Sequence, residues 1–530
     1  MNTYQNGLFD FGFVTEILWF QKLKRDNFVF ACKHSNLALD LNMLQPYKLK
    51  IQALFFLCCL FCCQPMTGQE ILWAKNNNQS KSTDYTRVVG QNKYGVYVLK
   101  HKNRALRKYF IIEQFDHRLQ LKKTKVFKLP NGELERVVVT QQQVQYLYKT
   151  YNKGRLNKLL LNVIDSNLNE GNPISLYEFA EDAYDISDFH VQLDKFNDKL
   201  CVWFLKDSMQ QTLLQYSVIQ EAKTLYRGKG IIKKPFEQLY VGDSEMDSSG
   251  NLYAIITHAI DVKSKSATDF SHYTVCVNTK QADLKLETLN NNASFISAYQ
   301  LAYNPAKHCM HMAYLGGYAD EDDNQFYGTK TIDCKSFSTV YQSINPIDRK
   351  MVSQIMGAKY EKNGDNLNKF KIKKLIPKAD MGCVLICERM FITTQSDVFY
   401  VNGVPQSTYA RIFNNDEVLV FSIKADGSEE WSNIITKNQT SINDGGYYNG
   451  IVVMVNEHDF HILYNDRISA NSDIIQVSFK PNGLFTKKIV LNNEQYYAMV
   501  IPSEYSQVSG NSMVLPINQN RDFTYIKLIY

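Results

Sequence analysis

The segment ADEDDN, residues 319–324, places three carboxylates close enough in the chain to hold a metal ion. Asp320, Asp322 and Asp323 are candidate calcium ligands, because hard cations bind clustered carboxylate oxygens. The segment lacks the glycine and the terminal glutamate of an EF-hand loop. We therefore favour a solvated acidic loop, and calcium is the one cofactor that the sequence leaves open.

Histidine pairs and enzyme motifs offer little further chemistry. His308 and His311, like His458 and His461, are three residues apart, so on a strand their side chains point to opposite faces and cannot chelate one ion. No H-E-x-x-H, G-x-S-x-G or P-loop pattern occurs in the chain. Acidic residues from separate repeats could still meet in a channel and cleave a glycosidic bond, although no pair stands out.

Six cysteines follow residue 68 and are candidates for disulfide bonds: Cys201, Cys276, Cys309, Cys334, Cys383 and Cys387. An oxidising compartment permits one or two such bonds, and buried free thiols are the alternative. Cys383 and Cys387 have three residues between them, which is not the spacing of a zinc ribbon or a redox C-x-x-C pair.

Composition indicates that sheets must position these groups. The chain has 33 Tyr and 30 Phe, and aromatic residues favour the pleated surfaces of strands. A net charge of +6 spread over 530 residues is not the footprint of a nucleic-acid-binding protein. We expect no nucleic acid among the partners.

Apolar, strand-like runs recur along the chain and predict a repeat fold. Their spacing is 50 to 57 residues, apart from two gaps of 75 and 76, as marked by Val96, Tyr146, Leu200, Leu252, Cys309, Val384, Phe460 and Met513. Several units contain an Asn-Gly or Asp-Gly hairpin turn. This pattern predicts an all-β chain folded as a β-propeller of four-stranded blades. Eight blades is the favoured count, seven is open, and tandem β-sandwich domains are the alternative fold.

The two ends of this repeat region are expected to meet. The last unit ends at Tyr530 on its third strand, and EILWAK (Glu70–Lys75) would supply the fourth, so that N- and C-terminal strands close the ring. Insertions near 316–327, 344–366 and 390–413 interrupt the repeats. In repeat folds such insertions map to loops, often on a binding face.

The most apolar segment, LKIQALFFLCCLFCCQPMTGQE (Leu49–Glu70), predicts export. Its apolar core covers only Ala53–Cys63, far short of the roughly 20 residues that cross a bilayer as a helix. Lys48 and Lys50 precede this core and Gly68 follows it before a polar start, as in a secretory signal peptide. A lipoprotein signal is the alternative.

Domain boundaries and compartment follow from that interpretation. Residues 43–68 form a complete signal peptide, and 1–42 are an extension that does not belong to the biological protein. Residues 69–530 are then a single propeller domain without a transmembrane helix. We expect an exported protein that is periplasmic, associated with the outer membrane or secreted.

Three stretches resemble a group of exported propeller-like proteins common in Bacteroidota. They are PKADMGCVLICERM (Pro377–Met390), the run from Asn415 to Gly450 that ends in INDGGYYNG, and HILYND (His461–Asp466). The resemblance covers roughly residues 377–466 and implies export and a propeller fold, with no assigned activity. Its most distinctive loop contains the binding candidates Asp444, Tyr447 and Tyr448.

Three aromatic residues of this region complete the set of candidates. Tyr400 and Tyr409 lie in the insertion near 390–413 and are further binding candidates. In FSIKADGSEEW, Trp431 occupies the place where a quinoprotein-type repeat has a tryptophan that staples adjacent blades. A single such match supports blade geometry rather than a quinone cofactor.

Two functions remain as hypotheses. The first is a binding or assembly scaffold of the cell envelope or extracellular space, whose partner is a glycan or another envelope protein. The second is a polysaccharide lyase or glycoside hydrolase that uses acidic residues in the propeller channel. The absence of a catalytic motif favours the scaffold, although a propeller fold by itself does not decide between them.

Overall fold

The computed structural model describes residues 18–22, 28–32, 69–74, 85–101, 108–179, 186–194, 197–208, 211–234, 239–259, 270–289, 295–318, 324–348, 353, 367–401, 404–457, 459–469, 472–492, 496–519 and 522–530. The chain divides into two compact units, Met1–Gly68 and Gln69–Tyr530. In the first unit the described strands are β1 (Leu18–Lys22) and β2 (Phe28–Cys32), which pair antiparallel. The signal peptide expected over 43–68 falls outside the described residues and stays a prediction.

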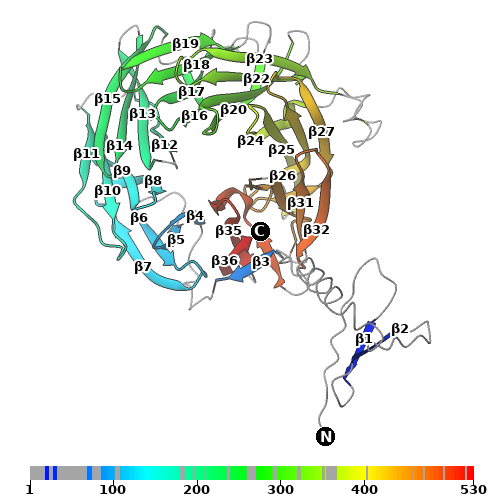
Figure 1. Ribbon diagram of the computed structural model, residues 1–530. Helices are drawn as coiled ribbons and strands as arrows, with labels where there is room; N and C mark the ends of the chain where they lie inside the picture. Colours follow the sequence, from blue (N-terminus) through cyan, green and yellow to red (C-terminus); the bar gives the residue numbers. More distant parts are fainter. Residues whose placement is uncertain are drawn as a thin grey trace, which may run out of the picture. The chain divides into compact units, whose positions relative to one another are not determined.

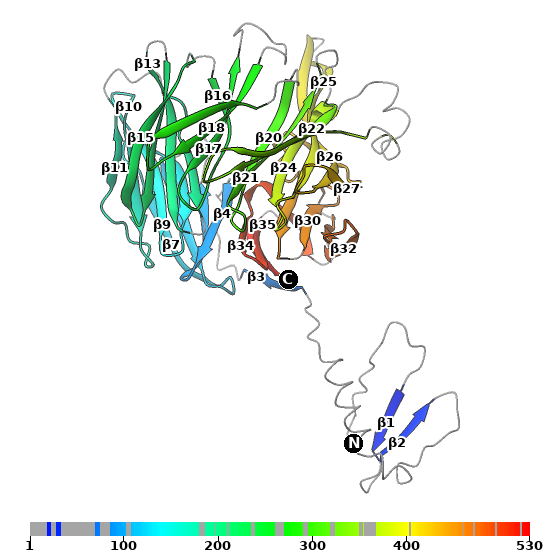
Figure 2. The same ribbon diagram turned by 45° about the horizontal axis from the view of Figure 1, so that its top comes forward.

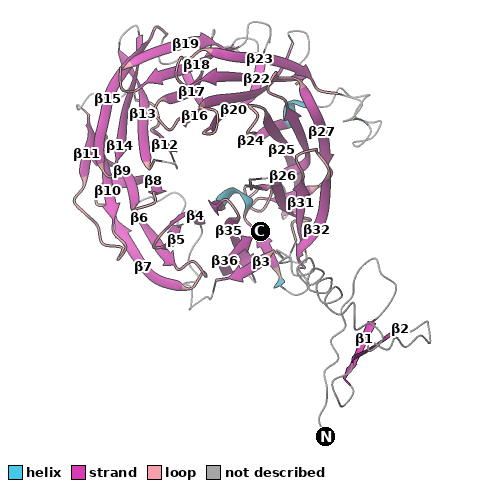
Figure 3. Ribbon diagram, in the orientation of Figure 1, coloured by secondary structure: helices cyan, strands magenta, loops and turns pink. Residues whose placement is uncertain are grey.

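Residues 69–530 form a β-propeller whose described strands make eight antiparallel sheets, arranged as blades around a central channel (Figures 1 and 3). Seven blades and tandem β-sandwiches, the alternatives from sequence, are therefore wrong. In blades 1 to 7 the strands follow one another in chain order from the channel outwards. Blade 8 takes its outermost strand from the beginning of the unit.

The innermost strands of blades 1 to 7 are β4 (Tyr85–Asn92), β8 (Gly132–Val139), β12 (His190–Asp194), β16 (Leu239–Met246), β20 (Phe295–Asn304), β24 (Phe370–Pro377) and β29 (Val452–Val455). In blade 8 the inner edge is shared by β33 (Ala498–Val500) and β34 (Ser506–Ser509). The second strands are β5 (Gly95–His101), β9 (Val144–Asn152), β13 (Lys199–Ser208), β17 (Leu252–Ala259), β21 (Cys309–Gly317), β25 (Cys383–Val401), β30 (Phe460–Asn465) and β35 (Ser512–Gln519).

The third strands are β6 (Tyr109–Phe115), β10 (Arg155–Ile164), β14 (Gln211–Gln220), β18 (Phe270–Asn278), β22 (Phe326–Asp333), β26 (Val404–Ile423), β31 (Ile474–Phe479) and β36 (Asp522–Ile529). The outer strands are β7 (Leu121–Lys128), β11 (Ile174–Glu178), β15 (Lys223–Ile232), β19 (Asp283–Thr288), β23 (Thr339–Pro346), β27 (Glu429–Ile435), β32 (Phe485–Leu491) and, in blade 8, β3 (Glu70–Trp73). Blade 6 adds β28 (Gln439–Ile442), and the short 3₁₀ helices are η4 (Leu367–Lys369) and η5 (Pro502–Glu504).

Burial explains which sequence runs become which strands. The second strand β5, GVYVLKH, is buried at every position, because neighbouring blades cover both of its faces. The outer strand β7, LKKTKVFK, is mostly exposed, as its lysines require. Between blades 3 and 4, Trp203 and Tyr216 pack with Leu252 in one apolar cluster, and all three are fully buried. Truncating such an aromatic side chain to alanine costs about 3–5 kcal/mol.

The ring is closed by pairing of the first and last strands of the propeller, as the sequence predicts. β3 pairs antiparallel with β36, with Ile71 opposite Leu528 and Trp73 opposite Ile526. The ring of Trp73 also stacks on Tyr496 at 5.1 Å between centroids. Closure removes two sheet edges that would otherwise be open to other chains.

One of the three predicted insertions folds differently from a loop. Residues 390–413 lie within β25 and β26, which are 19 and 20 residues long and pair continuously up to Val401 opposite Val404. They form a hairpin that prolongs the blade, because the segment is rich in Thr, Val, Ile, Phe and Tyr. In Figure 2, the yellow β25 rises to the top of the ring. The insertions near 316–327 and 344–366 fall partly outside the described residues.

Within the part of the chain that the structure describes, no helix has the length and apolar character needed to span a bilayer.

Candidate ligand-binding channel

The inner strands of all eight blades enclose a cavity of about 1380 Å³. Its wall combines apolar residues with both signs of charge. The cations of the wall are Arg87, Arg136, Lys374 and Lys378, and the acids are Glu135, Asp194, Glu245 and Glu457. The wall therefore carries as many positive as negative formal charges. These charges are unevenly distributed around the ring, because both arginines lie in blades 1 and 2.

Arg87 and Arg136 form the most distinctive part of the wall. Arg87 is on β4 of blade 1 and Arg136 is on the neighbouring inner strand β8 of blade 2. Burial lowers the pKa of Arg136, and the charge of Arg87 lowers it further, so the two guanidinium groups act on each other. Arg136 is nevertheless solvent-exposed, as expected for a group that faces water inside an enclosing wall.

Glu504 is the carboxylate that contacts Arg87, and it has other partners. Tyr85 donates a 2.8 Å hydrogen bond from its hydroxyl to Glu504 Oε2, and the Arg87 Nε lies 3.8 Å from the same oxygen. Burial, together with the Glu504 charge, raises the pKa of Tyr85 to about 12. The tyrosine therefore remains a neutral hydrogen-bond donor throughout the physiological range.

Two other carboxylates near the channel also bind protein groups. Glu135 Oε2 is 2.7 Å from Lys149 Nζ. Asp243, on β16, accepts a 2.7 Å hydrogen bond from the backbone nitrogen of Leu301 in the next blade. Burial raises the pKa of Asp243 despite this bond. These acids connect strands, which is a structural role.

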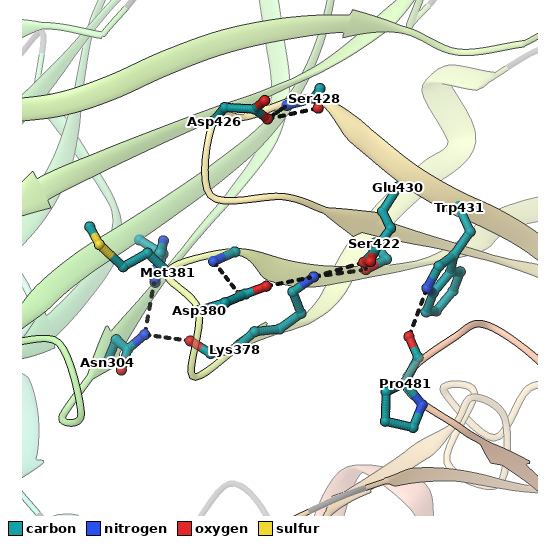
Figure 4. A network of polar contacts seen from close by, with 12 residues as sticks. Asn304, Lys378, Asp380, Met381, Ser422, Asp426, Ser428, Glu430, Trp431 and Pro481 are labelled. Atoms are coloured by element: carbon teal, nitrogen blue, oxygen red, sulfur yellow. Dashed lines mark hydrogen bonds and ion pairs between the residues drawn. The ribbon is translucent and has the colours of Figure 1, made fainter.

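A polar network begins at the channel wall and crosses blade 6 (Figure 4). Asn304, at the end of β20, donates a 2.8 Å hydrogen bond to the carbonyl oxygen of Lys378. The Lys378 ammonium is 2.8 Å from Glu430 Oε2, and Ser422 donates to the same oxygen at 2.8 Å. Asp380 lies farther from Lys378, at 3.7 Å. The network ties blade 5 to the turn between β24 and β25 and to the strands β26 and β27 of blade 6.

Trp431 lies beside this network on the outer strand β27 and connects blades 6 and 7 (Figure 4). Its Nε1 donates a 2.9 Å hydrogen bond to the carbonyl oxygen of Pro481, in the turn between β31 and β32. The indole also lies parallel to Phe479, with 6.1 Å between centroids. The residue proposed from sequence as a blade staple thus makes its contacts across a blade boundary.

The loop that carries Asp444, Tyr447 and Tyr448 joins blade 6 to blade 7 and packs against blade 8. Asp444 accepts hydrogen bonds from Ser441 Oγ and the Gly446 nitrogen, which shapes the turn. Tyr448 accepts a 2.6 Å hydrogen bond from Asn518 of β35. Tyr447 and Tyr448 meet edge to face at 5.3 Å, and both are half-buried. These contacts hold the loop in place at the junction of blades 6, 7 and 8.

The other two tyrosines of the predicted binding set lie apart from this loop. Tyr409 is on the β25–β26 hairpin, where its side chain is 69% exposed. Tyr400 lies near the tip of the same hairpin, opposite Pro405 in the backbone pairing. Asn443 reaches the base of the hairpin, because its nitrogen donates to the Arg411 carbonyl oxygen. The structure thus brings Asp444, Tyr447 and Tyr448 together and places the other pair on the hairpin.

A buried charge cluster stands where the blade 6 sheet passes into this hairpin. Glu388 is fully buried, with Lys437 Nζ 2.8 Å from Oε1 and Lys373 Nζ 3.3 Å from Oε2. Burial raises the pKa of Glu388, but the two lysine charges outweigh it and hold that pKa below its usual range. Lys437 also donates to the Asn415 carbonyl oxygen and to Gln439 Oε1. Every partner of this ion pair comes from blade 6.

The candidate calcium ligands Asp320, Asp322 and Asp323 lie outside the described residues. Within the described residues no group of three or more His, Cys, Asp or Glu side chains is arranged to hold a metal ion.

The six cysteines after residue 68 are all free and buried in the structure. Of the two arrangements that the sequence leaves open, buried free thiols or one or two disulfides, the structure has the buried thiols. Burial raises the pKa of Cys201 to about 12 and that of Cys309 to about 11. These thiols are packing residues.

Sequence reasoning missed the arginine pair, although a signal was present. Arg87-Val88-Val89 and Arg136-Val137-Val138 repeat the same tripeptide at the same place in two successive inner strands. When an arginine recurs at the same position of successive inner strands, both side chains can line the same channel. Gly90 and Val139, each three residues after the arginine, also touch, since a Cβ on Gly90 would lie 3.0 Å from that of Val139.

Comparison with known proteins finds no matching family model and no curated relative in sequence. Among solved structures, prolyl oligopeptidase B from Galerina marginata is similar at 8% identity and a TM-score of 0.38, covering 83% of this chain and 56% of that one. The chain thus matches little more than half of that enzyme's length.

Two bacterial proteins are also similar in structure. A protein of unknown function from Bacteroides caccae matches at 9% identity and a TM-score of 0.26, covering 66% of this chain and 93% of that one. A protein from Lactobacillus plantarum matches at 11% identity and a TM-score of 0.27, covering 66% and 98%. Similarities at this level assign no activity to the chain.

Proposed function

We propose that this protein is an exported binding scaffold of the cell envelope or extracellular space, which holds a glycan in its central channel. The channel itself carries the proposal: it measures about 1380 Å³ and every blade contributes to its wall. Pockets for small molecules measure about 300–1000 Å³. A larger channel suits an oligomeric ligand.

The chemistry of the wall supports a glycan. Tyr85, Tyr303 and Tyr505 line the channel, and a tyrosine offers both an apolar ring face and a polar hydroxyl. Gln300 Oε1 is buried in the wall and has no hydrogen-bond partner among the described residues, so a ligand hydroxyl can donate to it. The core of a protein–protein interface is depleted in charged residues. Eight charged side chains therefore fit a hydroxyl-rich chain better than a protein partner.

Export is part of the proposal and has separate support. The segment over 43–68 has the basic flank, short apolar core and small residue of a signal peptide. The resemblance over residues 377–466 also concerns exported proteins. A periplasmic, outer-membrane-associated or secreted protein would meet envelope and extracellular polysaccharides directly.

The alternative is a polysaccharide lyase or glycoside hydrolase that uses channel acids. Such an enzyme needs a pair of carboxylates available to the substrate. Of the four wall acids, Glu135, Asp194 and Glu245 instead contact Lys149, the Asn197 amide and the Met246 backbone nitrogen respectively. This observation favours binding over turnover.

Glycan binding can be tested by affinity electrophoresis of the isolated protein in gels that contain single polysaccharides. We expect retardation by at least one polysaccharide, and loss of it in Ala306→Trp, which places a large ring at the channel wall. Val340→Trp, on the exposed outer strand β23, is the matched control and should bind normally. Retardation that survives Ala306→Trp, or release of reducing or unsaturated products from the bound polysaccharide, would contradict the proposal.

A further inference from the structure

We infer that Arg87 and Arg136 together form an oxyanion subsite, which binds the carboxylate or sulfate group of an acidic glycan in the channel. The inference rests on the proposed function and adds the chemical class of the ligand. It follows from three observations: the two arginines lie on neighbouring strands, the carboxylates beside them also have other partners, and both line the same cavity.

The placement of the two arginines is set by the backbone. β4 and β8 are the inner strands of successive blades, and they come close where Gly90 meets Val139. A side chain on Gly90 would press on Val139, so the glycine permits this approach. Both arginines lie on these neighbouring inner strands and line the same channel.

The charge of this pair is not balanced locally. Arg136 makes no hydrogen bond or ion pair among the described residues. Arg87 has one carboxylate, Glu504, at 3.8 Å from its Nε, and that carboxylate also accepts hydrogen bonds from Tyr85 and from Ser503 Oγ. The charge of Glu135 also acts on Arg136, but Glu135 is 2.7 Å from Lys149, so both carboxylates beside the two arginines have other partners.

An oxyanion between the two guanidinium groups would relieve this imbalance. Guanidinium groups bind planar or tetrahedral oxyanions through two parallel N–H donors, and such charge-assisted hydrogen bonds are about twice as strong as neutral ones. The partly enclosed wall strengthens the attraction relative to bulk water. The side-chain oxygen of Gln300 in the same wall remains available for an uncharged hydroxyl of the same sugar chain.

The test measures affinity for three soluble probes: polygalacturonate, dextran sulfate and neutral dextran. We expect the acidic probes to bind more tightly than dextran, with affinity falling as salt rises. Arg87→Gln and Arg136→Gln should each weaken acidic-probe binding about 10-fold or more. Arg136→Lys should fall in between, because an ammonium keeps the charge and loses the two-donor geometry. Arg118→Gln, an exposed arginine on a turn outside the channel wall, is the matched control and should bind like the parent protein.

The outcomes separate the subsite from the proposed function. A preference for polygalacturonate that depends on both arginines supports a carboxylate ligand, and a preference for dextran sulfate supports a sulfate ester. Dextran bound as tightly as the acidic probes, with no effect of either arginine, would overturn the oxyanion subsite and leave the glycan scaffold standing.

Failure of all three polymers to bind would count against the glycan scaffold, and free sulfate then tests the subsite by itself. Sulfate that raises the thermal midpoint of the parent protein more than that of the Arg87→Gln/Arg136→Gln variant supports the subsite. Equal shifts would overturn it. Circular dichroism and urea midpoints of each variant show that its fold is retained.

Discussion

The indole of Trp431 in blade 6 donates its Nε1–H to the carbonyl oxygen of Pro481 in blade 7, at 2.9 Å. The contact needs a glycine beneath it: a Cβ on Gly483 would lie 2.7 Å from the indole. Blade packing at this boundary therefore depends on one side chain and on the absence of another. The pair allows a direct test of how strongly the blades are coupled.

Trp431→Phe should lower the free energy of unfolding by about 1 kcal/mol, because one hydrogen bond is lost while an aromatic ring remains over Phe479. Gly483→Ala should cost more than Gly445→Ala in urea denaturation. Both glycines have positive φ, +83° and +74°, but a Cβ on Gly445 would meet nothing within 4 Å. Equal losses for the two glycine variants would show that the indole contact contributes no stability.

Lys437→Met should destabilise the protein by about 3–5 kcal/mol, because it leaves the fully buried Glu388 without its closest positive charge. Adding Glu388→Gln to that variant should recover part of the loss, since a neutral amide tolerates burial better than a lone carboxylate. Urea midpoints of the two single variants and the double variant measure the coupling. Additive losses would contradict a direct interaction.

Acid should destabilise the protein from about pH 6.5 down to about pH 4. Burial lowers the pKa of His311 to about 4 and that of His461 to about 4, against an ordinary value near 6.5. In this window the unfolded chain binds protons that the folded chain does not, so stability falls as pH falls. Above pH 6.5 both states are neutral at these sites and the effect vanishes.

The measurement for these histidines is the urea midpoint as a function of pH. His311→Asn and His461→Asn should each flatten the decline between pH 6.5 and 4, whatever their effect on stability at pH 8. His117→Asn, at an exposed turn, is the control and should leave the slope unchanged. An unchanged slope in the His311 and His461 variants would show that these two histidines do not set the acid response.

Thiol alkylation should show the cysteines free. Without reductant, protein unfolded in urea should take up six alkyl groups on a chain that begins at Gln69, whereas native protein should react slowly. Burial of Cys383 raises its pKa to about 12, so little thiolate exists at neutral pH. Mass spectrometry counts the groups, with a reduced sample as control. Four or fewer groups before reduction would reveal a disulfide.

The intact mass of the protein from fractions of its native cell tests export. We expect a chain that begins at Gln69, in the periplasm, the outer membrane fraction or the medium, because the predicted cut follows Gly68. A lipid-modified cysteine at the new amino terminus would favour the lipoprotein alternative. A mass that includes residues 1–68 in the cytosol would contradict export altogether.

The fold was predictable because its information is local and repeated. The apolar second strand of each blade is visible in the sequence, as in the runs around Leu252 and Phe460. The last unit lacks one strand, and the sequence predicts that Glu70–Trp73 supplies it. The hairpin over 390–413 was harder, because extra residues in a repeat pattern look the same whether they form a loop or lengthen two strands.

The channel site was less predictable because it exists only when blades stand side by side. Arg87 and Arg136 are far apart in sequence, and the Arg-Val-Val tripeptide that their strands share is the one local sign that the two side chains line the same cavity. The loop around Asp444 is conspicuous in the sequence, and its role in binding stays a prediction. Its Gly-Gly turn and tyrosines serve contacts among three blades, so a distinctive sequence was explained by packing.

Closure of the ring by β3 and β36 also determines how the propeller responds to force. Glu70 lies opposite Ile529, so the two chain ends leave this strand pair on the same side. Tension between the ends would peel the pair apart one hydrogen bond at a time, rather than shear all of them together. We therefore expect blade 8 to open first under tension. The other seven sheets are each made from one continuous segment and should stay folded.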